Sequence, residues 1–238
     1  MDSVLHGQRV LIVGGSSGIG LGVATAAARA GATVTIASRS RAKLDAALAT
    51  LEGAATAVVL DTGDDEAVER LLAPVDEWDH VVVSAAQTAT GPVRTLSLAD
   101  AKAAMESKFW GAYRVARAAH IRDGGSLTLV SGTLSVRPSA TLVLQGAINA
   151  ALEALAQGLA LELAPVRVNA VSPGLIETPI WAGMESGQRD TLFAGAAQRL
   201  PARRIGQAED IANAVMFLLT TPFATGSTVR VDGGGAIA

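Results

Sequence analysis

The stretch RVLIVGGSSGIGLG, from Arg9 to Gly22, decides the fold of this chain. The apolar run Val10–Val13 predicts a buried strand, and the Ala-rich segment that follows the last glycine of the motif predicts a helix. Between them, Gly14, Gly18 and Gly20 let the backbone turn sharply and approach a ligand closely. The free N–H groups and the positive end of the helix dipole then face a bound anion. The stretch predicts the phosphate cradle of a dinucleotide-binding unit; the competing interpretation is a plain strand-to-helix turn.

Short apolar runs alternate with longer helical stretches along the whole chain. Near-continuous apolar runs are typical of parallel strands that helices cover on both faces. The repeated strand–helix units predict an α/β fold, with residues 1–238 forming a single Rossmann-type domain around a doubly wound parallel sheet. The ligand crevice is expected at the carboxyl ends of the strands. The expected strands are Val10–Val13, Thr33–Ser38, Ala57–Leu60, His80–Ser84, Leu127–Ser131, Arg167–Val171 and Thr228–Val231.

Composition narrows the classes of function. Half of the 238 residues are hydrophobic and 17% are charged, so the chain can bury a large core. The net charge of −3 and the lack of a basic block argue against nucleic-acid or membrane partners. The absence of cysteine excludes disulfides and thiolate chemistry. The first residues lack the pattern of a signal peptide. We expect a soluble cytoplasmic protein with a small-molecule substrate and no metal site.

The glycine spacing resembles the short-chain dehydrogenase/reductase family, whose pattern is T-G-x3-G-x-G, with Val13 where the family usually has Thr. The resemblance covers the chain from about residue 7 to residue 234. It includes RVNAVSPGLIETP at residues 167–179, which matches the family's R-V-N-x-V-x-P-G-x-x-x-T-P, and the D-G-G ending at residues 232–234. The resemblance implies seven strands in the order 3-2-1-4-5-6-7 and a nicotinamide dinucleotide cofactor.

The end of the second predicted strand bears on the choice of cofactor. Ser38 stands where family members that prefer NAD typically carry Asp, and Arg39 follows directly. A guanidinium can hold a 2′-phosphate through two hydrogen bonds. The pair therefore favours NADP(H) over NAD(H). The alternative is that Arg39 is a solvated charge at the start of a surface helix.

Three further places complete the implied cofactor site. Asp61 matches a family residue that contacts the adenine amino group, although Asp61 or Thr62 could instead cap a helix that begins near Asp64. Ser84 to Gln87 replaces the family's N-N-A-G. The loop from Pro173 to Thr178 is placed beside the nicotinamide, with a plain structural loop as the alternative. The implied cofactor-binding residues are Gly14, Ser16, Ser17, Gly18, Ile19, Gly20, Ser38, Arg39, Asp61, Thr62, Ser84, Ala85, Ala86, Pro173, Gly174, Ile176 and Thr178.

The catalytic segment departs from the family pattern. The family has a Ser at the end of the fifth strand, a Tyr thirteen residues later and a Lys four residues after the Tyr. Counted from Ser131, those places hold Leu144 and Ile148. Because an aliphatic side chain donates no proton, the usual acid is missing, and such assistance is typically worth about 10²–10⁴-fold in rate.

Lys108 offers a replacement charge. The segment from Leu98 to His120 predicts one long helix, and the family has an Asn three residues before a Gly on this helix, where this chain has Lys108 before Gly111. We hypothesise that Lys108 brings its charge next to Ser131 and polarises or protonates a bound oxygen; the alternative is an ordinary surface lysine. Tyr113 lies about 140° further around the helix and is assigned to packing or a subunit interface.

Residues 175–203 are expected to cover the substrate as a small lid. Within them, Trp181 to Leu200 predicts a mobile helical segment whose apolar side chains either line a pocket or pack on the core. The resemblance also implies a homodimer or a homotetramer.

Three functions follow. The first is an NADP(H)-dependent oxidoreductase that acts on a carbonyl or alcohol by a non-standard proton-transfer route, with Ser131 binding the substrate oxygen and Lys108 supplying charge. The second is a catalytically silent NADP(H)-binding protein that acts as sensor, scaffold or inactive subunit. The third is a non-redox enzyme that reuses the pocket for elimination or isomerisation. Fold alone does not decide among them.

Overall fold

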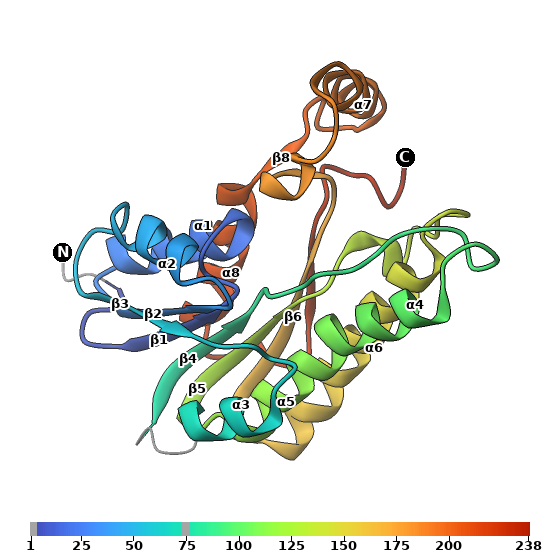
Figure 1. Ribbon diagram of the computed structural model, residues 1–238. Helices are drawn as coiled ribbons and strands as arrows, with labels where there is room; N and C mark the ends of the chain where they lie inside the picture. The colour runs from blue at the N-terminus through green and yellow to red at the C-terminus, as the bar shows by residue number, and fades with distance from the viewer. Residues whose placement is uncertain (1–3, 73–76) are drawn as a thin grey trace.

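A parallel seven-stranded sheet forms the centre of the computed structural model, which describes residues 4–72 and 77–238 (Figure 1). The strand order is β3-β2-β1-β4-β5-β6-β9, which confirms the predicted order once a separate two-stranded pair, β7-β8, is set aside. Each predicted strand is present, with ends shifted by up to six residues. The observed strands are β1 (Arg9–Val13), β2 (Thr33–Ser38), β3 (Ala55–Val59), β4 (Trp78–Val83), β5 (Ile121–Val130), β6 (Arg167–Pro173) and β9 (Thr228–Val231).

Helices cover both faces of the sheet because successive strand residues point to opposite sides. Val10 and Ile12 of β1 belong to one buried cluster, together with residues of α1, α2 and α8. Leu11 and Val13 belong to the other, together with residues of α3, α5 and α6. Figure 1 shows the two layers on either side of the sheet. The helices are α1 (Gly18–Arg29), α2 (Arg41–Leu48), α3 (Asp65–Leu72), α4 (Leu98–Met105), α5 (Gly111–Ala118), α6 (Val143–Glu162), α7 (Ser186–Arg199) and α8 (Ala208–Thr220).

The predicted helix from Leu98 to His120 is present as one unbroken helical segment that ends at Ala118 and has a π turn in its middle. It consists of α4, a π-helical turn at Glu106–Trp110, and α5. After α5 the chain enters β5 at Ile121, six residues before the predicted start. A π turn inserts one extra residue into a helix and is frequent at functional sites. The periodicity of the sequence does not reveal it, because the apolar residues on either side still follow a helical spacing.

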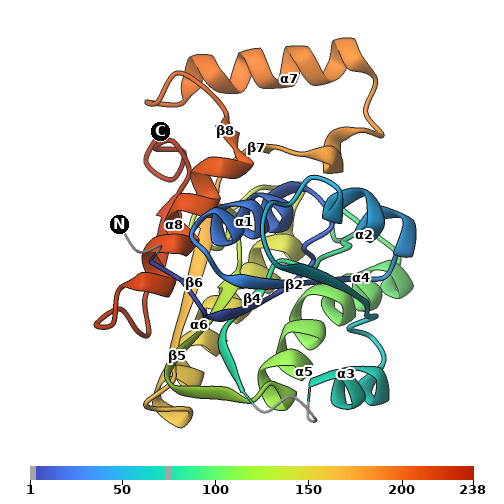
Figure 2. The ribbon, with the colours of Figure 1, turned by 90° about the vertical axis from the view of Figure 1, so that its left-hand side faces the viewer.

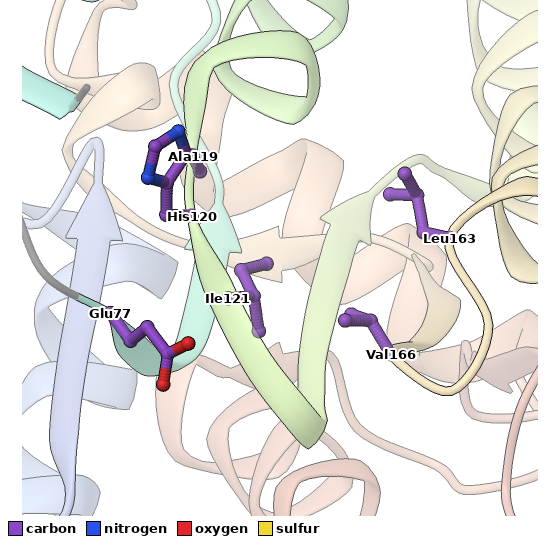
Figure 3. Close-up of a pocket in the computed structure, with 6 residues that line it drawn as sticks. All are labelled: Glu77, Ala119, His120, Ile121, Leu163 and Val166. Carbon is purple, nitrogen blue, oxygen red and sulfur yellow. The ribbon is translucent and has the colours of Figure 1, made fainter.

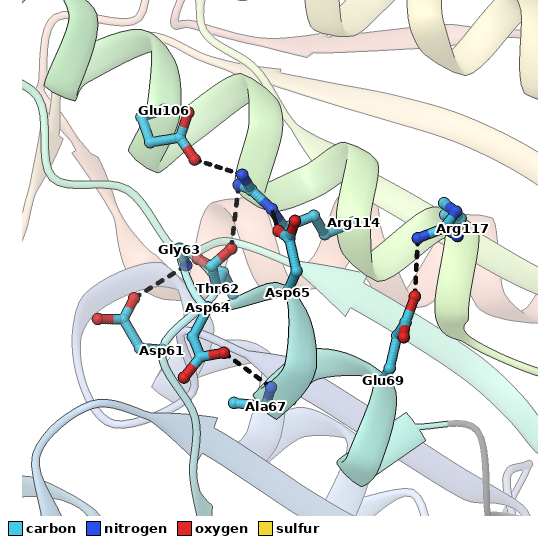
Figure 4. Close-up of polar contacts among 10 residues, drawn as sticks. All are labelled: Asp61, Thr62, Gly63, Asp64, Asp65, Ala67, Glu69, Glu106, Arg114 and Arg117. Carbon is cyan, nitrogen blue, oxygen red and sulfur yellow. Dashed lines mark hydrogen bonds and ion pairs between the residues drawn. The ribbon is translucent and has the colours of Figure 1, made fainter.

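α3 begins at Asp65, close to the expected Asp64, but its cap differs from the prediction. The Asp64 carboxylate accepts a hydrogen bond from the Ala67 amide at 3.0 Å and caps the helix, whereas Asp61 accepts from the Gly63 amide at 2.9 Å in the preceding turn. Arg114 of α5 bonds to both Asp65 and Glu106, and so ties the first turn of α3 to the π turn (Figure 4). The helix cap is therefore Asp64 and neither of the two residues expected.

Beyond β6 the chain leaves the sheet. β7 (Ile176–Glu177) pairs with β8 (Gly206–Gln207), and between them α7 stands apart from the helices that cover the sheet (Figure 2). Trp181 packs edge-to-face on Phe193 with ring centroids 5.9 Å apart. Ala196 is the only buried residue of α7. This segment thus makes few contacts with the core.

A buried histidine lies at the opposite end of the strands. The His80 ring contacts Ser126 Oγ at 2.8 Å and Gln8 Oε1 at 2.7 Å, and its exposed fraction is 3%. Burial, with the positive charge of Arg167 as a second cause, lowers the pKa of His80 from 6.5 to about 4. His80 is therefore neutral near pH 7. Among residues 4–72 and 77–238, no helix has the length and apolarity needed to cross a membrane.

Candidate functional site

The glycine turn after β1 has no room for side chains. A Cβ on Gly14, whose φ is +91°, would lie 2.5 Å from the Ala85 amide nitrogen. A Cβ on Gly20 would lie 2.1 Å from the carbonyl oxygen of Gly14. Real Cβ atoms do not approach so closely, so both positions require glycine. The first turn of α1 therefore sits directly against the turn, as a dinucleotide cradle requires.

The amino end of α1 is open to an anion. Ser17 occupies the position before the first helical residue, yet its side chain makes no capping hydrogen bond. The first N–H groups of a helix lack partners within it, and the helix dipole makes this end positive. The residues present therefore fit a pyrophosphate, which the sequence assigned to Ser16, Ser17, Gly18 and Ile19.

Two distant parts of the sequence meet at this turn. A Cβ on Gly18 would lie 3.3 Å from Thr178 Cβ, so the loop after β6 lies against the glycine turn. Gly174 packs so closely on Asp232 that its Cβ would come within 2.6 Å of the Asp232 Cα. The Ile176 carbonyl accepts a hydrogen bond from the Trp181 indole at 2.9 Å. The structure therefore brings the predicted nicotinamide loop, which starts at Pro173, next to the predicted phosphate cradle.

The other predicted cofactor residues lie at the carboxyl ends of β2, β3 and β4. The Ser84 amide donates to the Val13 carbonyl at 2.8 Å, which joins the end of β4 to the glycine turn. Thr62, after β3, is 9% exposed and touches α5, because a Cβ on Gly111 would lie 2.7 Å from Thr62 Oγ1. Arg39 follows β2, and its guanidinium donates a hydrogen bond to Gln87 Oε1. Ser38, Asp61, Ala85 and Ala86 belong to these same strand ends.

Lys108 lies in the middle of the π turn and points into the molecule. Its Nζ donates to the Ser131 carbonyl oxygen at 2.8 Å and to Asn149 Oδ1 at 2.6 Å. Burial lowers the pKa of Lys108 from 10.5 to about 8, while the negative charge of Glu153 opposes the shift. The surface-lysine alternative does not describe this side chain, and the geometry places its ammonium beside Ser131 as hypothesised.

The Ser131 hydroxyl already has hydrogen-bond partners within the protein. Its exposed fraction is 4%, and its Oγ contacts Glu153 Oε1 at 2.9 Å and the Val171 carbonyl at 3.2 Å. Ser135 Oγ donates to the same Glu153 oxygen at 2.7 Å. The contact between Lys108 and Ser131 is made by the main chain. These contacts favour a structural role for the Ser131 hydroxyl over the expected role in binding a substrate oxygen.

The α6 residues that face Lys108 are one position later than the count from Ser131 indicated. Ile148 is fully buried, whereas Asn149 is the residue that bonds to Lys108. Gln145, one turn earlier on the same helix face, donates a hydrogen bond to the Ala89 carbonyl. Its Oε1 is buried and has no hydrogen-bond partner in the part of the chain that the structure describes. The sequence analysis missed these two amides, Gln145 and Asn149.

A signal for Gln145 and Asn149 is present in the sequence. The frame Ala147, Ala150, Ala151 and Leu152 matches the family's Y-x-A-S-K-A-A-L when the family's Tyr is set at position 145, and the count then starts from Gly132. The structure agrees with this start, because a Cβ on Gly132 would lie 2.7 Å from Asn149 Nδ2.

Tyr113, the single tyrosine, lies on α5 and is 41% exposed. Its ring packs edge-to-face on Trp110 at 5.6 Å. No hydrogen bond links it to Lys108 or Ser131 among the described residues. This position fits the expected packing role.

A hollow of about 340 Å³ lies away from this site (Figure 3). Glu77, His120, Ile121 and Val166 line it, near the starts of β4, β5 and β6. It is therefore at the amino ends of the strands, opposite the glycine turn. No group of three or more His, Cys, Asp or Glu residues within 4–72 and 77–238 is arranged to hold a metal ion.

The chain is similar in sequence and in structure to known dehydrogenases and reductases. The family model described as Enoyl-(Acyl carrier protein) reductase matches residues 13–235. A short-chain dehydrogenase/reductase of Acremonium sp is 30% identical over 96% of this chain and 95% of its own. Among solved structures, a small-chain dehydrogenase in complex with NADPH is 33% identical over 97% of this chain and 99% of its own, with a TM-score of 0.81.

A second solved structure is the MalC Reductase/Diels-Alderase from Malbranchea aurantiaca, which is 26% identical over 100% of this chain and 99% of its own, with a TM-score of 0.93. The match extends over the glycine turn, the strand order and the loop after β6 together. The chain belongs to the short-chain dehydrogenase/reductase family.

Proposed function

We propose that the chain is an NADP(H)-dependent oxidoreductase that reduces a carbonyl or oxidises an alcohol, with Lys108 supplying the charge at the reacting oxygen. The observation that carries the proposal is the position of the Lys108 ammonium, 2.8 Å from the Ser131 carbonyl oxygen at the end of β5 and 2.6 Å from Asn149 Oδ1 of α6. The cofactor fits the glycine turn, which a Cβ at Gly14 or Gly20 would fill. The similar small-chain dehydrogenase in complex with NADPH supports the choice of NADP(H).

We infer further that Gly132, Gln145 and Asn149 take the places of the family's Ser, Tyr and Lys. The family pattern has an Asn on the helix that bears Lys108 and a Lys on α6. This chain has Lys108 on the first and Asn149 on the second, so the ammonium and the amide have exchanged helices. Their hydrogen bond at 2.6 Å is what this exchange requires. Ser131 then positions the site, since its carbonyl binds Lys108 and its hydroxyl binds Glu153.

This chain's residues act on the oxygen of the substrate. The nicotinamide, when bound, supplies or accepts a hydride. The Lys108 ammonium stabilises the negative charge that develops on the carbonyl oxygen as the hydride is added. With a pKa of about 8, Lys108 is also able to give a proton to that oxygen near neutral pH and to take one at higher pH. The ammonium then takes over both tasks of the family's Tyr and Lys.

Residues 175–203 form the proposed lid over the substrate. α7 makes few core contacts, and the Trp181–Phe193 pair places an apolar surface on this segment. Such a segment can close on a ligand without disrupting the sheet. The dimer or tetramer and the cytoplasmic location stay predictions.

The test combines binding with turnover. NADPH binding to the purified protein is followed by the fluorescence of the reduced nicotinamide, and a panel of aldehydes, ketones and alcohols is then screened by its absorbance. We expect NADPH to bind more tightly than NADH and at least one carbonyl to be reduced. Failure to bind either nucleotide would refute the proposal.

A second candidate is a protein that binds NADP(H) without hydride transfer. Its support is that the single tyrosine lies on the outside of α5, so this chain has no tyrosine acid at the site. Such a protein would act as sensor, scaffold or inactive subunit, or would use the pocket for a non-redox reaction. The similar protein from Malbranchea aurantiaca is a reductase/Diels-Alderase, which favours the non-redox version. NADPH binding with no oxidation across the panel would select this candidate.

A further inference from the structure

Arg39 and Gln87 bond to each other from the two strands that flank the glycine turn. Arg39 follows β2 and Gln87 follows β4, and the Arg39 Nη2 donates to Gln87 Oε1. Both strands pair with β1, whose last residue, Val13, is level with Ala37 and Val83. We propose that Gln87 positions the Arg39 guanidinium beside the glycine turn and thereby sets the preference for a 2′-phosphate. The proposal rests on the proposed NADP(H) function.

The Gln87 side chain starts from a fixed point. Its main-chain N–H donates to Ser107 Oγ at 2.8 Å, and Ser107 belongs to the π turn that carries Lys108. An arginine that is free in solution samples many rotamers, and ordering it costs free energy when a ligand binds. An acceptor that already binds Arg39 removes part of that cost before the ligand binds. Gln87 therefore acts through Arg39 as a positioning residue.

The partner is an amide, which leaves the charge of Arg39 unneutralised. A guanidinium has five N–H donors in a planar fork, and the bond to Gln87 uses one of them. The other donors remain for phosphate oxygens. Two other arginines show the contrast, since Arg41 pairs with Asp45 at 3.4 Å and Arg114 pairs with two carboxylates. Arg39 has no carboxylate partner among the described ion pairs, so its charge is available to an anion at the strand ends.

The family pattern has Gly at position 87, where this chain has the longer side chain of Gln87. The Gln87 side chain supplies an acceptor for Arg39, which a Gly at this position would lack. This contact also predicts which substitutions will matter. Gln87→Met keeps the length of the side chain and removes the acceptor. Gln87→Glu keeps the acceptor and adds a negative charge that repels a phosphate.

The experiment measures dissociation constants by calorimetry for two probes, 2′,5′-ADP and 5′-AMP, which differ by the 2′-phosphate. We expect the wild-type protein to bind 2′,5′-ADP more tightly than 5′-AMP. Gln87→Met should raise the dissociation constant for 2′,5′-ADP about three- to tenfold, the typical value of one hydrogen bond, and leave that for 5′-AMP within about twofold. Gln87→Glu should weaken 2′,5′-ADP by more than about tenfold. The control is Gln157→Met, the same change at an exposed position of α6.

Three results separate this inference from the function on which it rests. Unchanged or tighter 2′,5′-ADP binding by Gln87→Met, with wild-type discrimination intact, would overturn the inference alone. Equal weakening of both probes would also overturn it, because the effect would not involve the 2′-phosphate. Wild-type protein that binds 2′,5′-ADP no better than 5′-AMP would overturn both the inference and the choice of NADP(H).

Discussion

The charge of Lys108 is expected to destabilise the fold at neutral pH, and the substitution Lys108→Met tests this. The pKa is lowered from 10.5 to about 8, and each pKa unit corresponds to 1.36 kcal/mol, so the buried charge costs about 3 kcal/mol relative to water. Between pH 8 and pH 10.5 the unfolded chain binds more protons than the folded one. Stability from this group therefore rises with pH across that window.

The magnitude follows from linkage between the two pKa values. The cost of Lys108 falls from about 3 kcal/mol at pH 7 to about 1 kcal/mol at pH 9.5. The unfolding free energy of Lys108→Met minus that of wild type should therefore fall by about 2 kcal/mol between pH 7 and pH 9.5. This change with pH does not depend on the fixed loss of the bonds to the Ser131 carbonyl and Asn149.

The assay is urea denaturation of both proteins at pH 7 and pH 9.5. Lys102→Met, at an exposed lysine of α4, is the control for removing a positive charge from the same region. Glu153→Gln should lower the pKa of Lys108 further, because the carboxylate opposes the shift that burial causes. A pH-independent difference between Lys108→Met and wild type would refute the reasoning.

Four other substitutions test the glycine turn, the fold and the proposed lid. Gly20→Ala should weaken NADPH binding by more than about tenfold, since its Cβ would meet the Gly14 carbonyl at 2.1 Å. Gly158→Ala, with open space around the position, should leave NADPH binding unchanged and raise stability by up to about 1 kcal/mol. Equal NADPH affinity of the two variants would contradict the cradle. Because the pKa of His80 is lowered to about 4, the unfolded chain binds more protons below pH 6.5, and acidification from pH 7 to pH 5 should cost about 2 kcal/mol through this residue. His80→Gln should remove that part of the acid sensitivity in urea titrations, and an equal loss in both proteins would count against it. Trp181→Ala should raise KM for a carbonyl substrate more than it changes NADPH affinity, if residues 175–203 form the lid; an equal effect on both would reject that role.

The sequence predicted the sheet well because parallel strands are buried on both faces and stand out as apolar runs. The strand order, the glycine turn and its contact with the Thr178 loop follow from the resemblance, and the structure confirms the order. The early start of β5 at Ile121 was missed because the residues that follow Ile121 are Arg, Asp and two glycines. Such residues carry no strand periodicity.

The site was predicted less completely. The hypothesis that Lys108 approaches Ser131 agrees with the geometry. It required only that the position of Lys108 on its helix be aligned correctly with the family pattern. The count from Ser131 missed Gln145 and Asn149, because a shift of one residue on a helix turns every side chain by about 100°. The π turn and the Arg39–Gln87 bond depend on contacts between distant segments, which no local pattern in the sequence records.

The central claim is that Lys108 assists hydride transfer at the substrate oxygen. Its most direct test is the steady-state rate of NADPH oxidation by wild type and by Lys108→Met, on the carbonyl from the panel that wild type reduces best. The account predicts that Lys108→Met still binds NADPH but loses about 100-fold or more in kcat, as for loss of a general acid. Equal rates for the two proteins would contradict it.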